Sequence, residues 1–360
     1  MPYCNIRDFG ARGDGVSDDT AAFERALRAA SETGTLYLPA GTYRLESVKI
    51  PSHITILGNA SWGYSAWGYE NNKRKQGPVT DPAVNGSTVL IPASGRGRAL
   101  WDMESCCGTR VAGLSFDGLM MGESFHAIRA PGSGDTRQNL VFEDVRICHF
   151  TGSGIDCSHT RGFSVRRSLI IKNQGSAILA DAARDGVILD TQLAYNDGAG
   201  LCGQGGIENL LITANRIEGG CPGGVWLKGA SGVSITGNSF DSPRGPAVTL
   251  LDCCAAAVSG NMARLCGQGC TGEFDSHMLF KGCRGISVTG NSFWGWPALA
   301  SNPWLARYGV LGDTLTDCVI SKNSFFECCR QEMIRLAGDN QGVLEQQNTG
   351  SAVSWSPPGV

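Results

Sequence analysis

The chain has 360 residues, a formal net charge of −3 and 50 glycines, about twice the usual glycine share of ~7%. Hydrophobic residues make up 42% of the chain and charged residues 18%, which is too apolar for a disordered protein and offers no basic surface for nucleic acid. The sequence contains no run of about 20 apolar residues, so it predicts no membrane span. This composition favours a chain that turns often around one long core.

The first predicted element is an amphipathic helix over residues 18–34, which begins with two aspartates and ends at Gly34. Short strands follow at 35–39 and 54–58. We expect residues 1–34 to form an N-terminal segment whose helix caps the open end of a solenoid. Apolar residues form one face of this helix: Ala22, Phe23, Ala26, Leu27 and Ala30.

Internal repeats organise the rest of the chain. The segment V-S-I-T-G-N-S-F at 233–240 returns as I-S-V-T-G-N-S-F at 286–293, and an asparagine follows an apolar alternation with spacings of 23, 19, 23, 23, 30 and 32. Asparagine tolerates left-handed backbone and hydrogen-bonds locally, so it suits a turn that recurs once per coil. The repeat predicts one continuous parallel β-helix of about ten coils over 35–350, with a tail at 351–360. The repeated asparagines are Asn173, Asn196, Asn215, Asn238, Asn261, Asn291 and Asn323.

The N-terminal motif N-I-R-D-F-G-A-R-G-D-G-V-S-D-D-T-A-A-F (5–23), followed by L-Y-L-P-A-G-T-Y (36–43), resembles the start of the pectate-lyase-like superfamily. That resemblance implies an all-β fold, a single-stranded right-handed parallel β-helix. It also implies a carbohydrate-active protein, since the superfamily includes lyases, glycosidases, epimerases and tailspikes. A weaker resemblance to the inulin fructotransferase family rests on residues 277–295, 308–310 and 336–340, and it implies a possible homotrimer.

One strand of each coil can be aligned by its apolar positions, from G-I-D-C-S-H (154–159) to H-M-L-F-K-G (277–282). Positions two and four of the six then face the core, and positions three and five face outward. The outward positions are polar over the middle coils, as an active-site groove requires and as any soluble β-helix also requires. The candidate substrate-binding residues on this face are Arg129, Gln204, Trp226, Asp252 and Lys281.

Asp156 and Asp181 are the main catalytic candidates. They fall on adjacent coils, two residues out of phase, which puts their Cα atoms roughly 8 Å apart. That separation suits an acid and a base that cleave a glycosidic bond, by hydrolysis or by fructosyl transfer. The alternative is a polysaccharide lyase or epimerase that uses Lys228, His159 and Arg129 on a uronate sugar. A glycan-binding or structural solenoid without activity is the second alternative.

Two insertions near 59–87 and 294–312 interrupt the repeat and are rich in aromatic residues. Long loops on a rigid scaffold often carry binding sites, so these insertions predict either sugar stacking or subunit contacts. Their candidate substrate-binding residues are Trp62, Trp67, Trp294 and Trp296.

The chain has 15 cysteines and no basic or apolar leader pattern at its start. This predicts a cytoplasmic protein with reduced thiols; a secreted protein with disulfides is the alternative. The spacings Cys266-x-x-x-Cys270 with His277, and Cys157-x-His159, lack the paired pattern of zinc sites. We therefore expect no metal and no cofactor, and an oligo- or polysaccharide as the partner, with no nucleic acid and no membrane.

Overall fold

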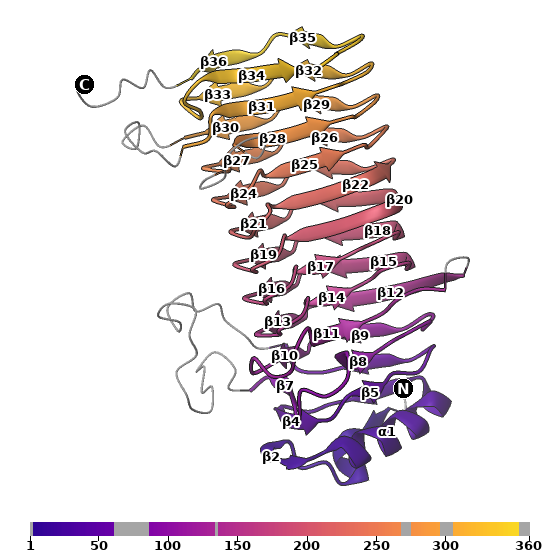
Figure 1. Cartoon of the computed structure of the whole chain (residues 1–360). Helices are drawn as coiled ribbons and strands as arrows, with labels where there is room; N and C mark the ends of the chain where they lie inside the picture. The colour runs from indigo at the N-terminus through magenta and orange to yellow at the C-terminus, as the bar shows by residue number, and fades with distance from the viewer. Residues whose placement is uncertain (1–2, 61–85, 134–135, 268–274, 296–304, 353–360) are drawn as a thin grey trace, which may run out of the picture.

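Short parallel strands wind around one axis and stack coil upon coil in the computed structural model, which describes residues 3–60, 86–133, 136–267, 275–295 and 305–352. The strands run from the N-terminal to the C-terminal end of a single elongated stack (Figure 1). The predicted right-handed parallel β-helix is therefore confirmed. Within the described residues, no helix has the length and apolar character needed to cross a membrane.

Most coils have strands on three faces, here called sheets 1, 2 and 3. Sheets 1 and 2 are parts of one 23-stranded sheet, because β20 (Leu201–Thr213) continues from the first into the second. Sheet 1 contains β5 (Val48–Lys49), β8 (Ala99–Asp102), β11 (His126–Arg129), β14 (Ile155–Asp156), β17 (Ile178–Leu179), the start of β20, β22 (Val225–Ser231), β25 (Val248–Leu251), β28 (Ser276–Lys281), β31 (Tyr308–Asp313) and β34 (Glu332–Ala337). Sheet 2 contains β1 (Cys4–Asn5), β3 (Thr35–Tyr37), β6 (Thr55–Leu57), β9 (Arg110–Ala112), β12 (Arg137–Glu143), β15 (Arg161–Arg166), β18 (Arg184–Leu189), the end of β20, β23 (Ser234–Thr236), β26 (Ala257–Ser259), β29 (Ser287–Thr289), β32 (Val319–Ser321) and β35 (Leu344–Gln346).

Sheet 3 has 13 strands, so the described chain makes more coils than the ten expected from the repeat. The repeat is visible only from about residue 150 onward, whereas the structure adds coils upstream whose sequences lack the recurring asparagine. The strands of sheet 3 are β2 (Asp14–Asp18), β4 (Gly41–Leu45), β7 (Thr88–Pro92), β10 (Ser115–Asp117), β13 (Arg146–Cys148), β16 (Leu169–Ile171), β19 (Gln192–Ala194), β21 (Arg216–Glu218), β24 (Ser239–Asp241), β27 (Met262–Arg264), β30 (Ser292–Trp294), β33 (Ser324–Phe326) and β36 (Thr349–Ser351).

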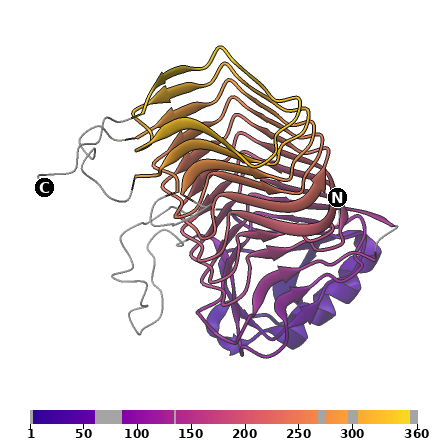
Figure 2. The ribbon, with the colours of Figure 1, turned by 45° about the horizontal axis from the view of Figure 1, so that its top comes forward.

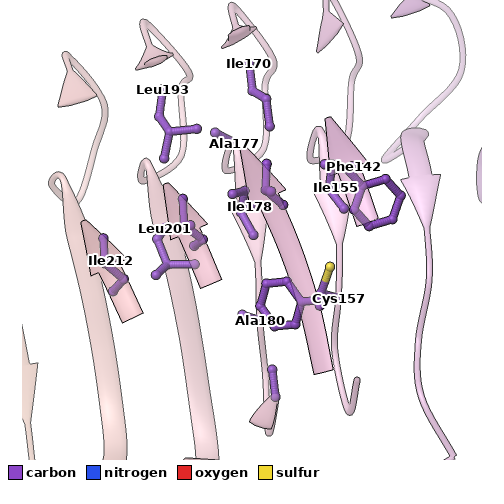
Figure 3. Close-up of a cluster of buried hydrophobic side chains, with 14 of the residues drawn as sticks. Phe142, Ile155, Cys157, Ile170, Ala177, Ile178, Ala180, Leu193, Leu201 and Ile212 are labelled. Carbon is purple, nitrogen blue, oxygen red and sulfur yellow. The ribbon is translucent and has the colours of Figure 1, made fainter. Parts of the chain in front are cut away.

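The core is a column of apolar side chains inside the coils. Figure 3 shows part of it, where Ile155, Ile178 and Leu201 of successive sheet 1 strands stack on one another. Cys157 and Ala180, at the next inward position of their coils, are also fully buried. The inward alternation expected for sheet 1 is therefore present, and it fixes which side chains face outward.

Helix α1 (Thr20–Thr33) lies across the N-terminal end of the stack (Figures 1 and 2), after a short 3₁₀ helix η1 (Ile6–Phe9). Its five predicted apolar residues are all buried, and Phe23 packs on Trp101 of β8 with ring centroids 5.6 Å apart. Asp19 precedes the helix but does not cap it with its side chain. Its carboxylate accepts the backbone N–H groups of Arg12 and Gly13 at 2.7 and 3.0 Å, which ties the preceding loop to the helix start.

The asparagines form two ladders at two different corners of the coil. Asn215, Asn238, Asn261, Asn291 and Asn323 each precede a strand of sheet 3, and each Nδ2 donates to the Oδ1 of the next asparagine at 2.9–3.0 Å. Asn173 and Asn196 instead follow sheet 3 strands, with a bond of 2.9 Å between them. The prediction that all the repeated asparagines form one series was wrong. The spacing of 19 residues, between Asn196 and Asn215, marks the step from one corner to the other.

We predict that Asn238→Ala lowers the free energy of unfolding by about 3 kcal/mol, because it leaves buried donors and acceptors of neighbouring coils without hydrogen-bond partners. Asn238 is 2% exposed, and its side chain accepts from Asn215 and donates to Asn261 and to the carbonyl of Ile212. Urea denaturation followed by circular dichroism measures the change. Ser239→Ala, at the adjacent half-exposed position, is the matched control, and equal stability of the two variants would contradict the ladder's contribution.

His277 predicts a pH dependence of stability. Burial lowers its pKa to about 4, while its Nε2–H donates to the carbonyl of Cys328 at 2.7 Å. The unfolded chain therefore takes up a proton below its ordinary pKa of 6.5, and the folded chain does so only near 4. The contribution of neutral His277 to the free energy of unfolding is fully present above pH 6.5, and the free energy falls by about 3 kcal/mol as the pH drops towards 4.

We expect His277→Gln to flatten this part of the profile when denaturation midpoints are compared between pH 7 and pH 4. His53→Gln, at an exposed position, should leave it unchanged. A profile that is equally steep in His277→Gln would assign the acid sensitivity to other groups.

Candidate functional site

The outer face of sheet 1 carries two parallel rows of side chains, because successive strands pair in register. The first row is Asp102, Arg129, Asp156, Leu179, Cys202, Trp226, Thr249, Leu279 and Leu311. The second row lies two residues further along each strand: Glu104, Pro131, Ser158, Asp181, Gln204, Lys228, Leu251, Lys281 and Asp313. The predicted residues of this face thus come from consecutive coils.

Arg129 is held at the N-terminal end of the face by two carboxylates. Its Nη1 lies 3.3 Å from Oδ1 of Asp102 and 3.2 Å from Oε2 of Glu104, and its side chain is only 14% exposed. These partners neutralise much of its charge before any substrate binds. Arg129 is therefore better placed to position neighbouring groups than to bind an anion by itself.

Asp156 is only 9% exposed, although it is the last residue of β14 and occupies an outward-facing position. Its Oδ1 accepts the backbone N–H and the hydroxyl of Ser158 at 3.0 and 2.6 Å. Both bonds close a local turn at the strand end. The carboxylate is therefore fixed in place, with little surface open to a ligand.

His126 lies beside Asp156 and was not among the sequence candidates. Its Nδ1 accepts the backbone N–H of Ser153 at 2.9 Å, so Nε2 carries the proton of the neutral ring. Burial lowers the pKa of His126, although the nearby Asp156 charge acts in the opposite direction. The sequence showed that His126 lies three residues before Arg129 on the same strand. It did not show that His126 lies beside Asp156, because alternation does not give the direction of a side chain at a corner of the coil.

Asp181 is half-buried in the second row, and its Oδ1 accepts the backbone N–H of Gln204 at 2.9 Å. The register places it two residues beyond the position opposite Asp156, a Cα separation of roughly 8 Å. Burial and the neighbouring Asp181 charge raise the pKa of the Cys202 thiol. His159 is exposed at the adjacent turn, where its backbone N–H donates to the carbonyl of Asp181 at 2.7 Å.

Lys228 and Trp226 share strand β22 and both reach solvent: Lys228 is exposed and Trp226 is half-buried. Gln204 pairs with Lys228, and Cys202 pairs with Trp226. Lys228 makes no salt bridge with any residue that the structure describes. An exposed ammonium group beside an indole can attract an anionic sugar and stack against its ring.

The face closes after Trp226. Thr249 and Leu279, the next two residues of the first row, are fully buried despite their outward positions. Asp252 lies exposed just past β25, and Lys281 is paired with Asp313 at 3.5 Å. These two predicted residues therefore lie beyond the open part of the face.

Among the described residues, the predicted Trp294 does not lie with the sheet 1 residues. Trp294 lies on β30 of sheet 3, where the guanidinium of Arg264 sits 5.4 Å from its ring centroid. Sheet 3 is a different face of the coil from sheet 1, so Trp294 is separated from Lys228. Trp62, Trp67 and Trp296 fall outside the described residues.

In the part of the chain that the structure describes, one group of side chains could hold a metal ion: Asp117, Cys148 and His149. It lies at the ends of β10 and β13 in sheet 3, away from the sheet 1 face. The cysteines within the described ranges are all free thiols.

Two family models match the sequence. The model of rhamnogalacturonase A/epimerase, pectate lyase-like, covers residues 3–106, and the model of the right-handed beta helix region covers residues 153–302. The first match includes the N-terminal motif, and the second spans the repeats and most of the candidate face.

Sequence relatives include mannuronan C5-epimerase AlgE2 of Azotobacter vinelandii, 31% identical over an alignment of 252 residues that covers 67% of this chain and 24% of that protein. Alginate lyase 7 of the same organism is 26% identical over an alignment of 206 residues that covers 55% of this chain and 23% of that protein. The chain thus spans about a quarter of the length of these curated relatives.

Solved structures share the whole architecture. The A-module of A. vinelandii mannuronan C-5 epimerase AlgE6 superposes with a TM-score of 0.68 at 19% identity, covering 96% of this chain and 99% of that chain. The DFA-IIIase of Arthrobacter chlorophenolicus A6 superposes with a TM-score of 0.65 at 14% identity, covering 95% and 93%. At these identities the likeness concerns the fold. Together with the family models, it shows that the chain has the right-handed parallel β-helix fold of pectate-lyase-like proteins.

Proposed function

We propose that the chain is a carbohydrate-active enzyme that removes the C5 proton of a uronate residue in a polysaccharide, as an epimerase or a lyase. The observation that carries this proposal is the exposed Lys228 ammonium group beside the Trp226 indole, in a row that also holds Asp181. Relatives named for mannuronan epimerisation and alginate cleavage support the same chemistry. These relatives favour proton removal from a uronate over the main prediction from the sequence, a glycosidase with paired aspartates.

The C5 proton of a uronate is acidic only when the adjacent carboxylate is neutralised, because its removal leaves a second negative charge on that group. Lys228 supplies the neutralising cation in this proposal. Its charge is available because no described carboxylate pairs with it, whereas Arg129 already has two acidic partners. Trp226, two positions earlier on the same strand, would hold the sugar ring against the face.

Asp181 is the proposed proton acceptor, since it shares the second row with Lys228 and only Gln204 separates them. Its Oδ1 is fixed by the Gln204 N–H, which leaves Oδ2 to take the proton from C5. His159, at the adjoining turn, would then deliver a proton. Delivery to the opposite face of C5 completes epimerisation, and delivery to the departing O4 as the C4–O bond breaks completes β-elimination.

The product identifies the reaction. We predict that incubation with polymannuronate, alginate or pectate in D₂O places deuterium at C5 of the sugar, which ¹H NMR detects. For an epimerase, the deuterated sugar has the inverted C5 configuration. A lyase instead gives an unsaturated uronide with ultraviolet absorbance. New reducing ends without unsaturation or C5 exchange would contradict the proposal and restore paired-aspartate hydrolysis by Asp156 and Asp181.

We predict that Lys228→Gln lowers kcat by about 10²–10³-fold, because the charge on the uronate carboxylate is no longer neutralised in the transition state. Initial rates on the active polymer measure the effect, and Lys228→Arg should recover part of it. Lys322→Gln, at an exposed turn between sheets 2 and 3, is the matched control. Equal rates for Lys228→Gln and Lys322→Gln would remove Lys228 from the site.

A further inference from the structure

Asp117, Cys148 and His149 form a compact group on the outer side of sheet 3. Asp117 ends β10 and Cys148 ends β13, and the two residues pair in register on adjacent coils. Phe116 and Ile147, the residues before them, are buried in the core, so Asp117 and Cys148 both point outward. His149 follows directly with a left-handed backbone, φ 60°, which turns its side chain back towards Asp117.

The group is almost completely enclosed. Asp117, Cys148 and His149 are 4%, 0% and 3% exposed. The chain that leaves β10 lies over them: the N–H of Leu119 donates to Oδ1 of Asp117 at 3.1 Å, and the N–H of Met120 donates to the carbonyl of His149 at 2.8 Å. Three polar side chains are thus gathered in a region from which water is largely excluded.

Their donor atoms are spaced as metal ligands are. Nδ1 of His149 lies 3.0 Å from Oδ1 of Asp117, and the carboxylate, imidazole and thiol donor atoms all lie within 4.8 Å of one another. A tetrahedral Zn²⁺ with Zn–S, Zn–N and Zn–O bonds of about 2.3, 2.0 and 2.1 Å holds its ligand atoms about 3.5 Å apart. Small side-chain movements would reach that arrangement.

The chemistry of the donor set favours zinc over calcium or magnesium. A thiolate and an imidazole are ligands for borderline divalent ions, whereas calcium and magnesium prefer sites made only of oxygen. The thiolate of Cys148 and the carboxylate of Asp117 together balance the two positive charges of Zn²⁺. Beside His149 lies a cavity of about 200 Å³ that Asp197 also lines.

We propose that Asp117, Cys148 and His149 bind one Zn²⁺ ion and that this ion joins the coils of β10 and β13 on the outer side of sheet 3. The site is independent of the sheet 1 face. Sequence spacing could not predict it, because Asp117 and Cys148 are separated by a whole coil and resemble none of the paired cysteine patterns of structural zinc sites.

The test uses the full chain, stripped with chelator under reducing conditions and then loaded with Zn²⁺ or Co²⁺. We expect one zinc per chain by elemental analysis, and a thiolate-to-cobalt charge-transfer band in the Co²⁺ form. Cys148→Ser should abolish the band and lower zinc affinity at least tenfold. Cys254→Ser, which removes an exposed thiol, should change neither.

Asp117→Asn and His149→Gln each remove one further ligand, and we expect each to weaken zinc binding about 10–100-fold. Because these variants keep side-chain size, they preserve the test if Cys148→Ser fails to fold. Absence of bound metal in a chain with native circular dichroism at saturating Zn²⁺ would overturn the proposal. A cobalt band that persists in Cys148→Ser would also overturn it.

Discussion

In-register stacking of parallel coils is the constraint on which the rest of this molecule depends. Each strand hydrogen-bonds to the same positions of the coil before and after it, so the side chains at equivalent positions form a column along the axis. Columns are favourable only when identical neighbours satisfy one another. The asparagine ladder meets this condition because the amide of Asn238 accepts from one coil and donates to the next. Apolar columns meet it by close packing.

Much of the fold could be predicted because its signals are local or periodic. The helix required only an apolar stripe and Gly34, whose N–H closes the last turn onto the carbonyl of Ala30. The inward positions of sheet 1 required only alternation. The corners were harder, because asparagine suits two different turns of the same coil. A single series therefore joined Asn196 to Asn215, which occupy different corners.

The candidate site could be predicted only as two rows, because alternation gives direction but not exposure. Asp156 and Trp226 occupy the same row, yet one is nearly buried and the other reaches solvent. Thr249 and Leu279 point outward and are fully buried. Whether an outward side chain is covered depends on segments that are distant in sequence. The partners of Arg129 lie one coil away, and they also could not be identified without the register.

The same stacking explains why this fold can carry separate sites on separate faces. The candidate residues of sheet 1 extend over four coil steps from Arg129 to Trp226, about 19 Å at the interstrand spacing, which suits a polymer lying along the axis. Sheet 3 presents its own columns, and there one step brings Asp117 against Cys148. The proposed metal site on sheet 3 and the proposed substrate face on sheet 1 therefore share no side chain. A substitution at one of them can test that site separately from the other.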